Sequence, residues 1–211
     1  MIDLILKKVF TFFKDIEGYF TLQYQVVKYL PRVFIDRKLI LDQMVHIGVN
    51  SLVLVSIIGL FTGAVSAWQA AYQMRGMVPL SILGSATPKA IIIELGPVLS
   101  ALVLAGRVGA SISAEIGTMK VTEQIDALEA MAINPIRYLA TPRIVATTIM
   151  LPVLIIYSSA IAIFGAYLVS TTFLDVSGGV FISGFRKSFE IADVNAAFVK
   201  GTVFGLAISS I

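Results

Sequence analysis

The 211-residue sequence contains no cysteine and only one histidine. These absences exclude disulfide frameworks, thiolate metal sites and cysteine nucleophiles. The sequence also lacks a glycine-rich phosphate loop with its lysine, a pair of carboxylates beside a nucleophile, and a cluster of metal ligands. We therefore expect no enzyme, no ATP hydrolysis by this chain, and no metal or directly bound cofactor. A membrane-bound lipid enzyme is disfavoured because His46 has no visible companions.

Charged residues are scarce: they make up 14% of the sequence, whereas 57% is hydrophobic. A soluble domain of this length is far less apolar, so the composition indicates a membrane protein. The alternative, a soluble helical domain with a large core, needs polar outer faces that the long uncharged runs do not provide. The net charge of +3 gives no reason to expect nucleic-acid binding.

Four apolar segments are predicted to cross the membrane: residues 45–68, about 90–105, 144–174, and 195 to the end. About 20 helical residues at 1.5 Å each span roughly 30 Å of hydrocarbon. Glu94 lies inside the second segment, and Pro97 is expected to bend it. The predicted fold class is thus an all-α integral membrane protein with a polytopic helix bundle.

Residues 1–41 are predicted to form a separate amphipathic segment, ahead of a transmembrane domain over residues 42–211. They contain no apolar run long enough for the core of a signal peptide. Apolar side chains recur at helical spacing opposite charged ones, which suits a helix lying in the headgroup layer. The alternative is an amphipathic helix packed on a soluble core.

Two sequence patterns bear on packing and orientation. Gly59, Gly63 and Ala67 are spaced four apart, as in helices that approach closely in lipid. Residues 1–41 and 107–143 hold seven and four Lys or Arg, against two in each of the other two connections. Basic residues gather on the cytoplasmic side, so we expect a cytoplasmic N-terminus.

The stretch between the second and third spans is too polar to cross lipid and too apolar for a simple loop. Thr122 is expected to cap a helix of about three turns, and Asn134 with Pro135 to end it, within residues 118–133. Such a cytoplasmic helix could transmit the motion of a soluble partner to the spans on either side. The alternative is a surface helix that seals the base of the bundle.

The run from residue 94 to residue 128 resembles the signature of the MlaE family, the permease subunits of MCE-associated lipid ABC transporters. The matching positions are residues 94–98, 105–107, 109, 114–117, 119 and 122–124. The resemblance extends to Phe61, Gly63, Gln69, Asn134, Pro135, Pro142, Lys200, Phe204 and Gly205.

This resemblance implies a homodimeric permease of the bacterial inner membrane that moves phospholipids or related lipids. Each copy would seat its coupling helix on a cytoplasmic ATPase, which uses the ATP, and a periplasmic MCE-domain protein would complete the lipid pathway. The alternative is a secondary transporter or channel for a small anionic or lipidic solute, which would not explain the coupling helix.

The expected site residues fall into four groups. Glu94, Pro97, Leu99 and Lys200 are assigned to the lipid pathway, with Lys200 or Arg107 as the partner of Glu94. The coupling residues are Thr118, Met119, Thr122, Glu123, Gln124, Asp126 and Leu128. Arg107 and Glu115 are expected to hold the second span against the coupling helix. Gly59 and Gly63 are expected to serve either dimer packing or helix packing. A purely structural pair at Glu94 is the alternative.

The sequence departs from the family in two ways. Members usually carry a further apolar helix at the C-terminus, so the chain is expected to lack its last span. Relatives also often have a basic residue just before the glutamate of the ELGP motif, where this sequence has Ile93. Any charge pairing of Glu94 must therefore involve another residue.

Overall fold

The structure, a computed structural model, describes residues 2–32, 36–74, 76 and 78–210. Its regular elements are helices, and these residues contain no strand. The α-helices are α1 (Ile2–Tyr29), α2 (Arg37–Ile47), α3 (Leu52–Met74), α4 (Leu83–Ala90), α5 (Gly96–Leu104), α6 (Ala110–Val121), α7 (Gln124–Ala130), α8 (Thr141–Thr172), α9 (Gly178–Ser188) and α10 (Ile191–Ser209).

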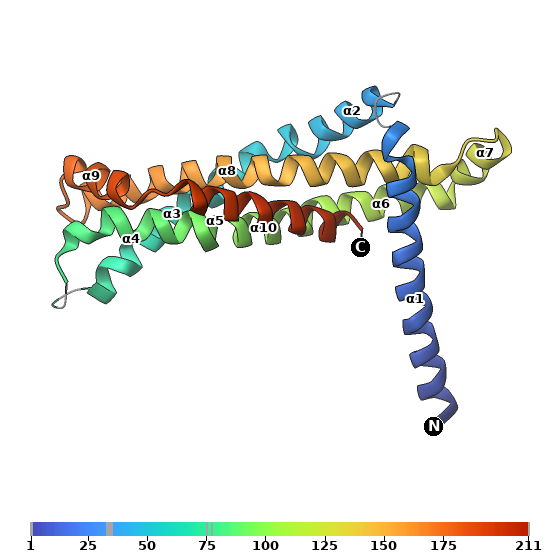
Figure 1. Ribbon diagram of the computed structural model, residues 1–211, viewed down its shortest axis with the longest axis horizontal. Helices are drawn as coiled ribbons and strands as arrows, with labels where there is room; N and C mark the ends of the chain where they lie inside the picture. The colour runs from blue at the N-terminus through green and yellow to red at the C-terminus, as the bar shows by residue number, and fades with distance from the viewer. Residues whose placement is uncertain (1, 33–35, 75, 77, 211) are drawn as a thin grey trace.

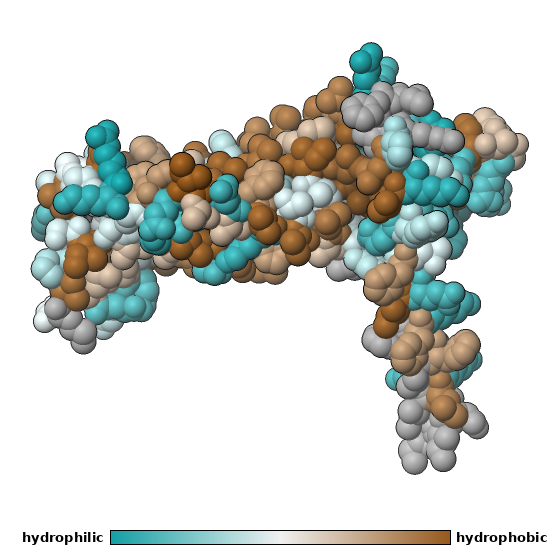
Figure 2. Space-filling model, in the orientation of Figure 1, coloured by the Kyte–Doolittle hydropathy of each residue, from teal (hydrophilic) through white to brown (hydrophobic). Residues whose placement is uncertain are grey.

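Four helical rods within the described residues are long and apolar enough to cross a membrane: Arg37–Met74, Leu80–Val121, Ile136–Thr172 and Ile191–Ser210. They run side by side along the long axis of the molecule (Figure 1). Figure 2 shows apolar side chains along the visible side of this bundle and hydrophilic ones gathered at its two ends. The predicted all-α, multi-pass membrane fold is confirmed.

The second rod is longer than the membrane is thick. It has 42 residues, or about 63 Å at 1.5 Å per residue, against roughly 30 Å of hydrocarbon. Two π-helical turns, Ile91–Leu95 and Ala105–Gly109, join α4, α5 and α6 into this rod. Such turns insert an extra residue into a helix and are frequent at functional sites. The sequence predicted a bend at Pro97 but neither π turn.

The long helix α8 is the centre of the bundle. It packs most extensively against α3 and α10, and also against α2 and α5. Leu151, Leu154 and Ile155 of α8 are almost completely buried beside Leu104 of α5. Because lipid supplies no hydrophobic force between spans, this close packing holds them together.

Glycines allow α3 to approach α8 closely. A Cβ at Gly63 would overlap the carbonyl of Ala162, and one at Gly59 would lie 2.9 Å from the carbonyl oxygen of Ser158. From the other helix, a Cβ at Gly165 would meet the carbonyl of Leu60. The structure therefore places Gly59 and Gly63 on a helix contact within one chain.

Helix α1 runs across the long axis of the bundle and projects away from it (Figure 1). It meets the bundle near its C-terminal end, at the π turn Ile136–Ala140 that leads into α8. Several of its large side chains are exposed, among them Phe10, Phe20 and Tyr24, whereas Val26 is buried. An amphipathic helix in this position suits the interface of a membrane better than water.

The opposite end of the bundle carries α9, which packs mainly on α4. Phe181 of α9 is buried against the bundle, and Ser177 caps the helix by accepting a hydrogen bond from the N–H of Val180 at 3.4 Å. This helix was not among those predicted from the sequence. Its signals were the cap at Ser177 and the spacing of four between Phe181 and Phe185.

Replacing Gly63 with valine should lower the free energy of unfolding by at least about 2 kcal/mol, because backbone fills the space that the side chain needs. Chemical or thermal unfolding of the detergent-solubilised protein measures this. Gly117→Ala is the matched control, since no atom lies within 4 Å of its added Cβ. Equal stability of Gly63→Val and the wild type would contradict the α3–α8 contact.

Candidate functional site

An ion pair lies inside the apolar zone, between the second and fourth rods. Glu94 belongs to the first π turn and Lys200 to α10, and Lys200 Nζ lies 2.6 Å from Glu94 Oε1. Of the two partners considered for Glu94, the structure selects Lys200. An unpaired charge at this depth is costly, so each residue stabilises the charge of the other.

The same ammonium group satisfies a backbone carbonyl. Lys200 Nζ donates to the carbonyl oxygen of Ile93 at 2.8 Å. In an α-helix that oxygen would accept from the N–H four residues later, but residue 97 is a proline and has none. Pro97 thus leaves a carbonyl without its regular helical donor at the level of Glu94, and Lys200 supplies a donor.

The pair lies at the surface of the single chain. The side chain of Glu94 is 61% exposed and that of Lys200 is 34% exposed. A few hydrophilic side chains interrupt the apolar side of the bundle over α5 and α10 (Figure 2). Leu99 is half-buried, whereas Pro97 is fully buried and its side chain lines no exposed surface of this chain. Hydrocarbon alone is a poor environment for this pair.

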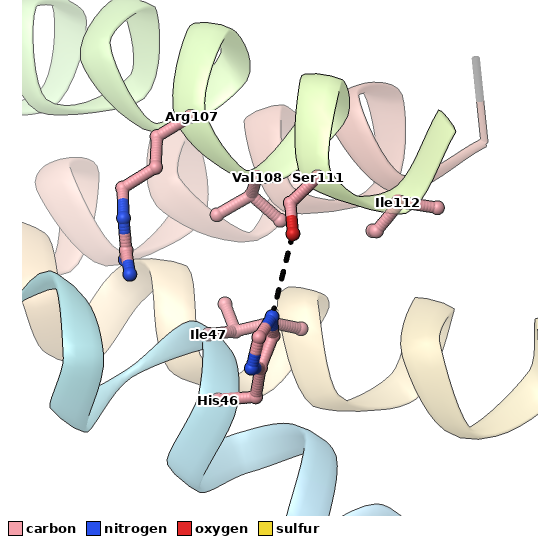
Figure 3. Close-up of a pocket in the computed structure, with 6 residues that line it drawn as sticks. All are labelled: His46, Ile47, Arg107, Val108, Ser111 and Ile112. Atoms are coloured by element: carbon pink, nitrogen blue, oxygen red, sulfur yellow. Dashed lines mark hydrogen bonds between the residues drawn. The ribbon is translucent and has the colours of Figure 1, made fainter. Parts of the chain in front are cut away.

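Arg107 does not pair with Glu94 or Glu115. It lies in the second π turn and donates to the hydroxyl of Ser51, which in turn donates to the carbonyl of Ile47. Arg107 also lines a small pocket of about 70 Å³ (Figure 3). There His46 Nε2 and Ser111 Oγ lie 3.4 Å apart. Arg107 therefore links the second rod to the junction of α2 and α3 in the first rod.

Glu115 pairs with a residue that the sequence analysis did not single out. Its Oε1 lies 2.7 Å from Nη2 of Arg143, at the start of α8. A second pair, Asp36 with Arg137, joins the start of α2 to the third rod through hydrogen bonds of 2.9 and 3.0 Å. Little in the sequence indicated these pairs: Glu115 and Arg143 are single charges near apolar runs, and Asp36 directly precedes two basic residues.

The predicted coupling helix is shorter than expected, and its predicted cap is wrong. Helix α6 continues the second rod to Val121, and the hydroxyl of Thr122 donates back to the carbonyl of Thr118 at 2.8 Å. Glu123 then takes a left-handed conformation (φ 58°), and α7 follows over Gln124–Ala130. The hydroxyl of Thr122 therefore ends one helix instead of starting the next, because it bonds within the last turn of α6.

Asn134 also has a different role from the predicted one. Its Oδ1 accepts a hydrogen bond from the N–H of Arg137 at 3.1 Å, and Pro135 follows it. Both features are typical of a helix start, so this dipeptide begins the third rod. Helix α7 ends earlier, at Ala130, and Ala132 has a positive φ of 58° in the connection.

The coupling segment lies beyond the end of the bundle, on the tip formed by α6 and α7 (Figure 1). Its main packing partner is α6. The side chains of Thr118, Thr122, Glu123, Gln124 and Asp126 are exposed, while those of Met119 and Leu128 are half-buried. The exposed side chains of this segment give the tip a largely polar surface.

The described residues contain no group of three His, Cys, Asp or Glu side chains that could hold a metal ion. The second rod carries a polar pair in the apolar zone and leads into the exposed tip formed by α6 and α7. The pair can receive a polar group from a molecule inside the membrane. The tip can receive a soluble partner.

The sequence matches known proteins over most of its length. Residues 40–211 match the family of the permease MlaE. A probable ABC transporter permease of Rickettsia typhi is 40% identical over 173 residues, which is 82% of this chain and 67% of that protein. The intermembrane phospholipid transport system permease protein MlaE of Haemophilus influenzae is 37% identical over 186 residues, 88% of this chain and 69% of that protein.

The Glu94–Lys200 pair should show energetic coupling in a double-mutant cycle of Glu94→Gln and Lys200→Gln. We expect about 1–2 kcal/mol, because each single change leaves a polar group without its partner. Unfolding in detergent measures the four variants. The control cycle at Lys89 and Glu190, a pair at the end of the bundle (2.9 Å), should give a smaller coupling. If the changes in unfolding free energy at Glu94 and Lys200 are additive, the pair contributes no coupling free energy and the prediction is wrong.

Proposed function

Because this chain belongs to the MlaE permease family and is the membrane permease of a lipid ABC transporter, not an enzyme, we propose that phospholipids pass along its Glu94–Lys200 face. The observation that carries this proposal is an exposed ion pair inside an apolar zone. A phospholipid matches it chemically, since the headgroup can contact the pair while the acyl chains lie on apolar walls. A soluble ATPase subunit drives the movement.

A second copy of the chain would complete the pathway. Val98 and Leu102 follow Glu94 at helical spacing and are 44% and 69% exposed. Val199 and Val203, beside Lys200, are 60% and 58% exposed. If two such faces oppose each other in a homodimer, their apolar side chains enclose the ion pairs. The pairs then border a central cavity that water and a headgroup can enter, which removes the cost of exposing them to hydrocarbon.

We place the α7 end in the cytoplasm of a bacterium, with the chain in the inner membrane. The two segments with the most Lys and Arg, residues 1–41 and 107–143, meet at this end of the bundle. The excess of basic residues favours the cytoplasmic side. The N-terminus is then cytoplasmic, the ATPase meets α7, and a periplasmic MCE-domain protein meets the opposite end, where α4 and α9 lie.

Motion would pass from α7 to the ion pair through one continuous rod. Helix α7 packs on α6, and α6 joins α5 and the Glu94 turn through the second π turn. A helix transmits displacement along its axis, and a π turn is a natural point for local rearrangement. Movement of the ATPase would therefore change the spacing of the Glu94–Lys200 pairs across the cavity.

Glu94→Ala should reduce lipid transport at least about tenfold, because it removes the carboxylate and leaves Lys200 uncompensated in the pathway. The measurement is movement of labelled phospholipid by the complete complex in proteoliposomes, with and without ATP. The variant should still insert and assemble. Asp175→Ala, an exposed carboxylate outside the spans, is the control. Normal transport by Glu94→Ala would remove Glu94 from the pathway.

Glu123→Lys should abolish co-purification of the ATPase, because Glu123 is exposed at the turn into α7 and reversal of its charge opposes docking. The MCE-domain protein at the other end should stay bound. Lys187→Glu on α9 is the matched control and should retain the ATPase. Loss of the ATPase from the α9 variant, with retention by Glu123→Lys, would reverse the proposed orientation.

A further inference from the structure

Arg143 is the one charged residue that is buried among the residues the structure describes. The residue is 3% exposed, and it lies on the third rod where α6, α8 and the end of α10 approach each other. A guanidinium group keeps its charge under all ordinary conditions and has five N–H donors. Burial of such a group requires an acceptor for each donor that is removed from water.

Glu115 satisfies only part of this requirement. Its Oε1 lies 2.7 Å from Nη2, and its side chain is 41% exposed. Nε and Nη1 of Arg143 are buried and have no hydrogen-bond partner within the described part of the chain. Donors of a charged group are the costliest to leave unpaired. The arrangement of Arg143 therefore calls for a further acceptor, and an anion suits it best.

Two pockets flank Arg143, and their charges differ. One, of about 220 Å³, is lined on the Glu115 side by a second carboxylate, Asp42. The other, of about 260 Å³, has no acidic residue in its lining. It is formed by Leu22, Ile112, Ser113, Ile116, Ala140, Arg143, Ile144, Ser209 and Ser210. Repulsion by carboxylates excludes an anion from the first pocket, so the second is the site.

The lining of this second pocket, the Arg143 pocket, suits a lipid better than a free ion. Its walls are apolar at Leu22, Ile112 and Ile144, and its polar groups are the guanidinium and serine hydroxyls. Ser113, an exposed residue of α6, contributes one of these hydroxyls. One phosphate group can meet the polar end while an acyl chain follows the apolar walls.

The pocket also lies at the depth of a headgroup. Leu22 comes from α1, which crosses the bundle near the end of α10 (Figure 1). An amphipathic helix in this orientation marks the boundary between headgroups and acyl chains. Glu115 lies 21 positions after Glu94 on the same rod, or about 30 Å away along the helix axis. The Arg143 pocket is therefore separate from the Glu94–Lys200 face.

We propose that the Arg143 pocket binds the phosphate of an anionic lipid in the leaflet at the α7 end of the bundle. Nε and Nη1 are buried in this structure, so the guanidinium turns toward the pocket when the phosphate oxygens accept from these two atoms, while Nη2 remains on Glu115. Through Glu115, the bound lipid fixes α6 just before Thr118, the first of the coupling residues. Lipid occupancy is thereby coupled to the position of α7. The proposal rests on the proposed function for the membrane orientation of the chain.

The test measures lipid retention by the complete permease–ATPase complex in detergent, by native mass spectrometry with added phosphatidylglycerol. Arg143→Lys keeps the charge beside Glu115 but removes the second and third donors. It should weaken phosphatidylglycerol retention about tenfold or more. Glu115→Gln leaves Nε and Nη1 in place and should retain the lipid. Arg186→Lys, on α9 at the opposite end, should behave as the wild type.

Competitors identify the source of the phosphate. Diacylglycerol, which lacks phosphate, should not displace phosphatidylglycerol, and inorganic phosphate should displace it only weakly. Equal retention by wild type and Arg143→Lys would overturn the proposal, as would displacement by diacylglycerol. Tight binding of inorganic phosphate without lipid retention would overturn a lipid site. Loss of lipid in Glu115→Gln but not in Arg143→Lys would show that Arg143 is only a structural partner of Glu115.

A transport assay separates this proposal from the proposed function. Glu94→Ala should keep the lipid at Arg143 while losing transport. If the wild-type complex retains lipid through Arg143 but moves none across the membrane, the transport proposal fails and the site stands. If transport proceeds and Arg143→Lys changes neither lipid retention nor the lipid dependence of ATP hydrolysis, the site fails and the transport proposal stands.

Discussion

The ammonium group of Lys200 is the interaction on which the functional region depends. Within an apolar bundle it neutralises Glu94 and donates to the Ile93 carbonyl, for which Pro97 provides no N–H. In lipid, an unpaired charge or an unpaired carbonyl has no water molecule to hydrogen-bond with. One side chain from α10 therefore provides the partner for a carboxylate and for a free carbonyl in the π turn before Pro97.

The same constraint gives the rest of the bundle its form. Because lipid does not drive spans together, α3 and α8 associate through backbone contact at Gly59, Gly63 and Gly165. This rigid frame holds α8 in the centre, and α10 packs on its other side with Lys200 directed toward the second rod. Among the described residues, the second rod has two π turns within its length, whereas the third rod begins with one at Ile136–Ala140. The second rod is also the one that joins the ion pair to α7.

Polar groups are arranged in three layers along this rod. Glu94 lies at the first π turn, Arg107 at the second, and Glu115 in the middle of α6. Each is paired with a different neighbouring helix, through Lys200, Ser51 and Arg143 respectively. A rod fixed to its neighbours at three levels moves as a connected unit, which suits a permease whose energy comes from a separate subunit at one end.

Sequence alone determined the fold class, the four spans, the position of Glu94 inside an apolar run, and the family. These features follow from apolar run length, residue counts and local motifs, which are all properties of the chain read in order. The partner of Glu94 was narrowed to Lys200 or Arg107, and only the packing of α10 on the second rod decided it. The cap at Thr122 was wrong because its hydroxyl had two competing backbone partners, and the continuation of α6 favoured Thr118.

Arg143 could not be recognised in the same way. In the sequence it is one more basic residue before an apolar run, and its burial arises only because α6, α8 and α10 converge there. The partners of the Glu115–Arg143 pair are 28 positions apart in the sequence, and those of the Glu94–Lys200 pair are 106 positions apart. Local pattern fixes which segments are helical and apolar, whereas the contacts between distant segments depend on how close the backbones approach, and that is decided in three dimensions.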